Sequence, residues 1–146
     1  MPKMENSTPI AAIDGNLRLW LPTMLWMITL FVLSTSFFSA ANTSKVILPV
    51  LRFLLPGASG ATIELLHGII RKAAHFTNYC ILFWILIHGP LARRPYTALA
   101  ICVCYAFLDE GHQILVPGRT PSLYDVALDS SGALFGRFLN VATNEL

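Results

Sequence analysis

Nine polar side chains in or beside apolar stretches of this sequence are the ones whose types and spacing could do chemistry. They are Lys72, His75, Asp109, Glu110, His112, Gln113, Arg119, Asp125 and Asp129. Carboxylates and imidazoles can transfer protons, and lysine and arginine can hold a phosphate or a carboxylate. Because a charge inside hydrocarbon costs at least about 2.5 kcal/mol, ionisable residues in such stretches are candidates for function.

The spacing of these residues predicts helical faces. In each of three segments the polar or small residues recur three or four positions apart and therefore share one face of a helix. The three sets are Lys72, His75 and Tyr79; Asp109, His112 and Gln113; and Asp125, Asp129, Gly132 and Gly136. Two glycines four apart let a neighbouring helix approach closely, which would carry the aspartates into the interior of a bundle.

The composition indicates that the helices lie in a membrane. Of 146 residues, 55% are hydrophobic and 12% charged, and the mean hydropathy is +0.61. The runs Leu19 to Phe38 and Ala73 to Ala92 contain no Asp, Glu, Lys or Arg and are long enough to cross a hydrocarbon core of roughly 30 Å. We therefore predict an all-α membrane protein with a bundle of four transmembrane helices at about 19–40, 72–92, 95–116 and 123–142.

The third and fourth predicted helices meet at a turn. The uncharged stretch from Pro95 to Leu108 is too short to span, so the helix should continue past Asp109 and Glu110 to about residue 116. Pro117 discourages continuation, Gly118 permits a sharp reversal, and Arg119 falls at the tip. Ser122 and Asp125 have the spacing of a capping box at the start of the fourth helix.

The rest of the chain is predicted more simply. Residues 1–18 read as a tail and residues 19–142 as one domain, whose first helix is an uncleaved anchor and not a signal peptide. The apolar decapeptide Val46 to Leu55 is too short to span and should be interfacial or re-entrant. Thr62 is the expected cap of an interfacial lead-in, Ile63 to Ile70, before the second span. The three cysteines lie in apolar segments and should pack as small hydrophobes.

Alternation of the spans predicts that the polar faces meet. The start of the second span, the end of the third and the start of the fourth would lie at one membrane surface, so all nine residues can converge on one pocket. With the amino terminus inside, five cations fall on each side. The paired Arg93 and Arg94 in a very short loop favour that side as cytoplasmic, which places the pocket at the outer face.

These residues resemble the VanZ-like family, named for a teicoplanin-resistance protein. The matching series is Lys72-Ala-Ala-His75-Phe76, Tyr79, Asp109-Glu110-Gly-His112-Gln113, Pro117-Gly118-Arg119, Asp125, Gly132 and Gly136. Asp129 departs from the pattern, which commonly has Asn there. The resemblance implies a multi-pass protein of the bacterial cytoplasmic (inner) membrane and cell envelope, associated in some members with antibiotic resistance to glycopeptides.

Two functions remain open at the level of sequence. In the first, the nine residues bind a lipid-linked cell-wall precursor, a lipoglycopeptide or another amphiphile among the membrane lipids, with Arg119 and Lys72 holding its anionic group. In the second, the protein is a membrane-embedded enzyme that uses Asp109, Glu110 and His75 as acid, base or metal ligands. Because cations lie close by and no compact ligand motif is present, we expect no metal and no cofactor, and scattered cations give no nucleic-acid footprint.

A purely structural role and a third function are the remaining alternatives. The same charges could merely clamp three helix ends together, since buried pairs can fix geometry without adding net stability. Ion translocation would need polar groups that continue across the bilayer, and the segments Ile81 to Ile87 and Thr97 to Leu108 offer almost none.

Overall fold

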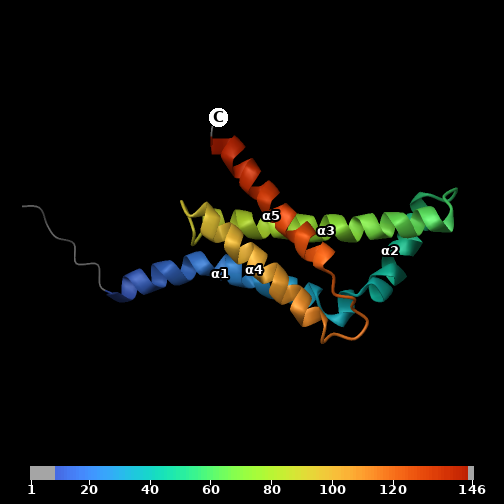
Figure 1. The fold of residues 1–146 in the computed structure, drawn as a ribbon, viewed down its shortest axis with the longest axis horizontal. Helices are drawn as coiled ribbons and strands as arrows, with labels where there is room; N and C mark the ends of the chain where they lie inside the picture. The colour runs from blue at the N-terminus through green and yellow to red at the C-terminus, as the bar shows by residue number, and fades with distance from the viewer. Residues whose placement is uncertain (1–8, 145–146) are drawn as a thin grey trace, which may run out of the picture.

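The described part of the chain, residues 9–144 of the computed structural model, consists of helices and connecting turns without strands. The helices, coloured along the chain in Figure 1, are α1 (Pro9–Leu33), the 3-10 turn η1 (Ser36–Phe38), α2 (Ala40–Leu54), α3 (Gly60–His88), α4 (Pro95–Gln113) and α5 (Leu123–Asn144). The prediction of an all-α fold is confirmed. The arrangement as four transmembrane spans stays a prediction.

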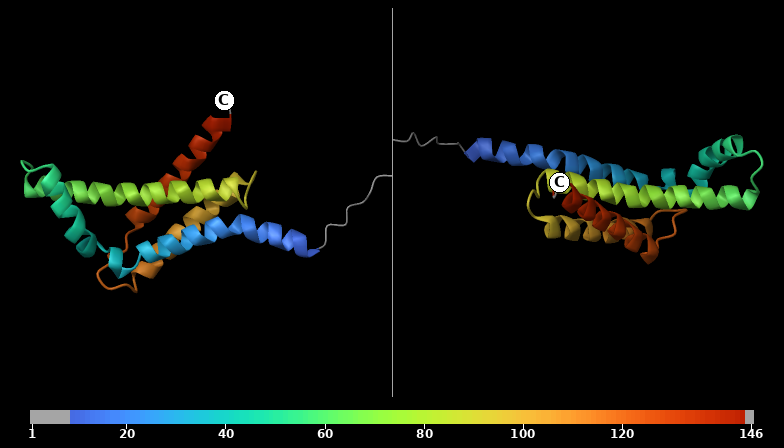
Figure 2. Two further views of the ribbon diagram at one scale, coloured as in Figure 1. Left: turned by 180° about the vertical axis from the view of Figure 1, so that it is seen from behind. Right: turned by 90° about the horizontal axis from the view of Figure 1, so that it is seen from above.

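Helix α3 is the axis of the molecule. Its 29 residues correspond to a length of about 43 Å, and every other α-helix packs against it. Figure 2 shows α1 and α2 on one side of α3, with α4 and α5 on the other. Helix α2 folds back along the first turns of α3, whereas α5 crosses the middle of α3 diagonally and makes the most extensive helix contact.

The crossing of α3 and α5 depends on two glycines. A Cβ atom added to Gly132 would lie 2.1 Å from the carbonyl oxygen of Phe76, and one added to Gly136 would lie 3.0 Å from that of Cys80. No larger residue fits at Gly132 without separating the helices. The predicted close approach at these glycines is confirmed, and it places Asp129, one turn earlier, against α3.

The core is built mainly from one face of α3. Tyr79, Leu82, Phe83 and Leu86 are almost fully buried, and small residues of α4 and α5 pack against them: Ala98, Cys102, Ala106 and Ala133. One hydrogen bond ties α1 to α4 and another ties it to α3. The Tyr105 hydroxyl donates to the carbonyl of Met27 at 2.6 Å, and Trp26 Nε1 donates to the carbonyl of Asn78 at 3.1 Å.

The first two predicted helices have different limits in the structure. Helix α1 begins at Pro9, within the predicted tail, and ends at Leu33, where Ser34 Oγ donates to the Phe31 carbonyl and the chain turns at the extended residue Thr35. Residues 1–8 of the tail lie outside the described residues. Helix α3 begins at Gly60, so the lead-in and the second predicted span form one continuous helix. Its cap is Ser59, whose Oγ accepts from the Thr62 backbone N–H at 3.2 Å, and the prediction of Thr62 as the cap was wrong.

The turn between α4 and α5 follows the prediction except in its cap. Regular helix ends at Gln113, turns continue through Val116, and Gly118 has a φ of +77°. Ser122 Oγ accepts from the Tyr124 N–H at 3.1 Å, as a capping serine should. The reciprocal bond is not made by Asp125. Glu110 of α4 makes it instead, since its Oε2 accepts from the Ser122 N–H at 2.7 Å.

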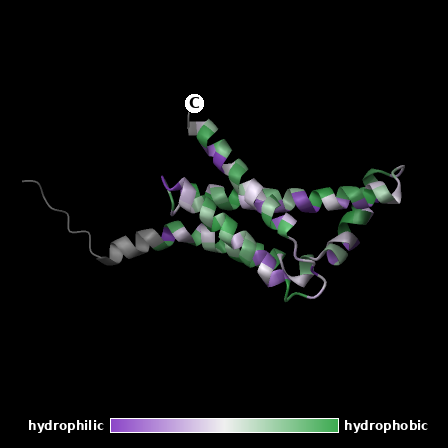
Figure 3. Cartoon of the chain, viewed as in Figure 1, coloured by the Kyte–Doolittle hydropathy of each residue, from purple (hydrophilic) through white to green (hydrophobic). Residues whose placement is uncertain are grey.

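The outer faces of the helices carry many large apolar side chains. Figure 3 shows apolar residues along every helix, and examples that are more than half exposed are Ile28, Phe53, Leu65, Phe107 and Phe138. Among the described helices, none has by itself the length and hydropathy of a membrane span, whereas the bent pair Leu17–Leu33 and Ser36–Leu54, at 66°, reaches them by length and composition.

Candidate functional site: an inner cavity and an outer pocket

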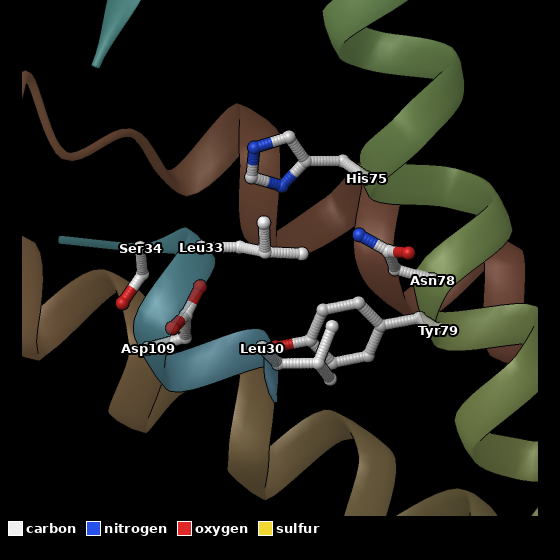
Figure 4. A pocket seen from close by; sticks show the side chains of 7 residues that line it. All are labelled: Leu30, Leu33, Ser34, His75, Asn78, Tyr79 and Asp109. Carbon is white, nitrogen blue, oxygen red and sulfur yellow. The ribbon is translucent and has the colours of Figure 1, made fainter. Parts of the chain in front are cut away.

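A small cavity lies where α1, α3 and α4 meet. Its volume is about 40 Å³, enough for a water molecule or a group of similar size. The lining residues, drawn in Figure 4, are Leu30, Leu33, Ser34, His75, Asn78, Tyr79 and Asp109. We call this the inner cavity. It joins the end of α1 to two of the predicted site residues, His75 and Asp109.

Two polar groups of the inner cavity have no hydrogen-bond partner in the protein. They are Asp109 Oδ1 and the Tyr79 hydroxyl, and their residues are only 7% and 1% exposed. Buried polar groups are nearly always hydrogen-bonded, because an unpaired one loses its hydration without compensation. The inner cavity is therefore a place where a donor would be stabilised.

His75 is held by a carboxylate from α5. Its Nδ1 lies 3.2 Å from Oδ1 of Asp129, which is fully buried, while the His75 side chain remains 24% exposed. The crossing at Gly132 brings this pair together. A carboxylate hydrogen-bonded to one ring nitrogen fixes the orientation of an imidazole. The other ring nitrogen is then free to exchange a proton with a ligand or with water.

Glu110 and Gln113 have partners within the protein. Gln113 Nε2 donates to Glu110 Oε1 at 3.0 Å and lies 3.5 Å from Asp109 Oδ2, while Ser122 occupies the other Glu110 oxygen. Both Glu110 oxygens are thus engaged, and Glu110 is a connection between the end of α4 and the start of α5. A mostly apolar groove of about 360 Å³ runs beside it, lined by side chains such as Phe107, Ile114 and Val126.

A second, larger pocket opens on the other side of His75. Its volume is about 240 Å³. The residues that line this outer pocket are Ala40, Glu64, His67, Gly68, Arg71, Lys72, His75 and Asp125. Arg71 Nη1 is buried without a hydrogen-bond partner, and Lys72 Nζ lies 5.6 Å from the centre of the Tyr124 ring. His67 Nε2 lies 3.2 Å from Thr43 Oγ1, which joins the pocket wall to α2.

Arg119 lies in neither set of lining residues. Its Nε and Nη2 donate to the Thr35 carbonyl at 3.1 and 2.9 Å, and Nη2 also donates to the Leu33 carbonyl. The guanidinium thus satisfies carbonyl groups at the carboxyl end of α1, where a cation is favoured by the helix dipole. Burial and the nearby charge of Arg71 lower the pKa of Arg119. A guanidinium remains charged at neutral pH even so, because its ordinary pKa is above about 12.

The structure thus sorts the nine predicted residues into five places. Asp109 and His75 line the inner cavity, with Asp129 behind His75, whereas Lys72 and Asp125 join His75 in the outer pocket. Glu110 and Gln113 hold one another. His112 contacts Phe31, with ring centres 4.4 Å apart and ring planes tilted by 32°, and Arg119 binds the end of α1. Within the described residues, no three His, Cys, Asp or Glu side chains are arranged to hold a metal ion.

Sequence reasoning missed Ser34, Glu64 and Arg71 as lining residues. Arg71 could have been found, because it lies one helical turn before His75 and two turns before Tyr79. Glu64 and His67 precede Arg71 on that face by seven and four residues, which a single continuous α3 would have revealed. Nothing in the sequence signals Ser34.

These features define a helical-bundle protein with a buried acidic cavity beside a mixed-charge pocket. The family model described as VanZ/LLP1 matches residues 19–142, and the chain belongs to the VanZ/LLP1 family. The resemblance stated from the sequence is confirmed. Neither the search of curated proteins nor the search of solved structures found a match.

Proposed function

We propose that this protein is a membrane protein of the bacterial cell envelope that binds an amphiphile, with the anionic group of its headgroup held in the outer pocket. The observation that carries the proposal is the pair Arg71 and Lys72 in one pocket of about 240 Å³, with Arg71 Nη1 buried and unpartnered. A guanidinium with a free N–H group binds a phosphate or carboxylate strongly and with a defined direction. Arg71 takes the role that the sequence suggested for Arg119.

The membrane setting is supported by the outward apolar side chains. An ordinary soluble monomer rarely exposes contiguous apolar surface beyond a few hundred Å², whereas large apolar residues are exposed here on each of the five α-helices. We infer four membrane crossings in the bacterial cytoplasmic membrane, with membrane lipids around the bundle and the outer pocket at the outer face. Helix α2 then flanks the pocket entrance beside the lipid headgroups.

The biological consequence we propose is lowered susceptibility to glycopeptides of the teicoplanin type. A lipid-linked cell-wall precursor and a lipoglycopeptide are both amphiphiles with anionic or polar heads. The antibiotic acts by binding the cell-wall precursor. A protein that binds either molecule at the outer face would keep the two apart.

The proposal is tested by binding to the purified full-length protein in detergent. We expect saturable binding of a lipid-linked wall precursor or of teicoplanin, and Arg71→Gln or Lys72→Gln should each weaken it about tenfold, the equivalent of one charge-assisted hydrogen bond. Arg52→Gln, an exposed cation on α2, is the matched control. Absence of saturable binding by the unaltered protein to either ligand would remove the proposal.

A second function, catalysis, is favoured by one observation, the contact between His75 and Asp129. A carboxylate-oriented imidazole that shares a cavity with a carboxylate oxygen lacking a partner, here Asp109 Oδ1, is an arrangement suited to general acid and base catalysis on a lipid-linked substrate. This alternative predicts that the protein converts a bound precursor to a new species. Incubation of the purified protein with the precursor and analysis by mass spectrometry distinguishes it from simple binding, with His75→Gln as the inactive variant.

A further inference from the structure

The inner cavity contains polar atoms that lack hydrogen-bond partners. Asp109 Oδ1 and the Tyr79 hydroxyl are both buried, unpartnered and part of the same small cavity. The side chains of Ser34 and Asn78 also line it, and Figure 4 shows the Ser34 hydroxyl oxygen close to Asp109 and the Asn78 amide with its nitrogen toward Leu33. The unpartnered atoms would be satisfied by a small group that carries several N–H donors and one positive charge and is about as large as a water molecule. A primary ammonium is such a group, with three donors and no acceptor.

The inner cavity and the cations of the outer pocket lie along one face of α3. Arg71, His75 and Tyr79 follow one another at intervals of four residues, which is about one helical turn each. His75 lines both spaces, and so it separates an anion-binding region from a donor-binding one. The two spaces therefore adjoin at the His75 side chain.

We propose that the ligand headgroup carries both an anionic phosphate and a primary ammonium, with the phosphate held by Arg71 and Lys72 and the ammonium seated in the inner cavity on Asp109 and Tyr79. This inference rests on the proposed function and names the substrate class of that site. His75, fixed by Asp129, lies between the two charges. A quaternary ammonium has no N–H donor and so cannot form a hydrogen bond to Asp109 Oδ1 or to the Tyr79 hydroxyl.

The test compares three short-chain lipids that share a phosphate. The purified full-length protein in detergent is titrated with phosphatidylethanolamine, phosphatidylcholine and phosphatidylglycerol. We expect phosphatidylethanolamine to bind at least about tenfold more tightly than phosphatidylcholine, because a buried charge-assisted contact is gained. Asp109→Asn should abolish this preference while the affinity for phosphatidylglycerol changes less than about twofold, since Arg71 and Lys72 remain.

A second variant keeps the proposal testable if Asp109→Asn does not fold. Tyr79→Phe removes only the hydroxyl and should also reduce the preference for the primary amine, and Tyr96→Phe, at an exposed position on α4, is its matched control. Free ethanolamine phosphate is added as a competitor. Competition at equal concentration would support the headgroup chemistry and assign it to a soluble ligand, whereas lack of competition would support an amphiphile.

The two proposals fail in different ways. Equal binding of phosphatidylethanolamine and phosphatidylcholine by the unaltered protein would overturn the ammonium site and leave the phosphate site intact. A preference that survives both Asp109→Asn and Tyr79→Phe would also overturn it. Failure of all three lipids, the wall precursor and teicoplanin to bind would overturn the proposed function itself.

Discussion

Arg119 and Thr35, 84 residues apart in the sequence, are joined by two hydrogen bonds of 3.1 and 2.9 Å from the guanidinium to one backbone carbonyl. This contact ties the loop between α4 and α5 to the end of α1, next to Ser34 and the inner cavity. An arginine that looks like a ligand contact in the sequence therefore acts on the backbone of another helix.

Replacing Arg119 should lower stability more than it lowers ligand affinity. Arg119→Gln loses charged hydrogen bonds worth roughly 1.5 to 3 kcal/mol, which for a chain of this size corresponds to a fall in Tm of several degrees. The measurement is thermal unfolding of the purified protein in detergent. Arg94→Gln, exposed at the start of α4, should change Tm little. A normal Tm together with lost ligand binding would show that Arg119 contacts the ligand.

Gly132→Ala should prevent the crossing of α3 and α5. Its Cβ would lie 2.1 Å from the Phe76 carbonyl oxygen, which is backbone and cannot move aside. We expect a destabilisation of about 3 kcal/mol or more, because the helices must separate and Asp129 loses His75. Protein abundance in the membrane fraction measures the effect. The control is Gly111→Ala, where a Cβ meets nothing within 4 Å, and abundance equal to that of the control would contradict the crossing.

Asp109 and Glu110 are neighbours in sequence but should behave differently. Glu110→Ala removes the acceptor for the Ser122 N–H and should destabilise the start of α5 by about 1 to 2 kcal/mol, and so reduce abundance. Asp109→Asn keeps the shape of the side chain and should leave abundance normal while the proposed lowering of teicoplanin susceptibility is lost. Both variants are scored for membrane abundance and for teicoplanin susceptibility in the same cells. The reverse result would make Asp109 a structural residue.

Membrane orientation is tested by labelling single cysteines in a background with Cys80, Cys102 and Cys104 replaced by Ala. A membrane-impermeant maleimide should label Thr120→Cys in intact cells and should label Ala92→Cys only after the membrane is opened. Both positions are exposed and lie in loops at opposite ends of α4. The opposite labelling pattern would place the outer pocket on the cytoplasmic side.

The amino-acid sequence by itself determined the all-helical fold, the turn at Pro117 and Gly118, the close crossing at Gly132 and Gly136, and the family. These depend on properties that are local or periodic: hydropathy, residue spacing, and the backbone freedom of a glycine. The sequence also predicted that the helix faces carrying His75 and Asp129 lie at the same end of the bundle, because the helix directions alternate, whereas the direct contact of these two side chains is known only from the structure.

Only the tertiary structure decided which polar groups are already satisfied and which are free. The sequence suggests Arg119 and Glu110 as ligand-binding residues. In the structure both side chains are already hydrogen-bonded to backbone groups of other segments. Asp109, Tyr79 and Arg71 keep unpartnered polar atoms. A hydrogen bond depends on atoms within about 3 Å of each other, and spacing along the chain cannot specify a distance between segments 84 residues apart.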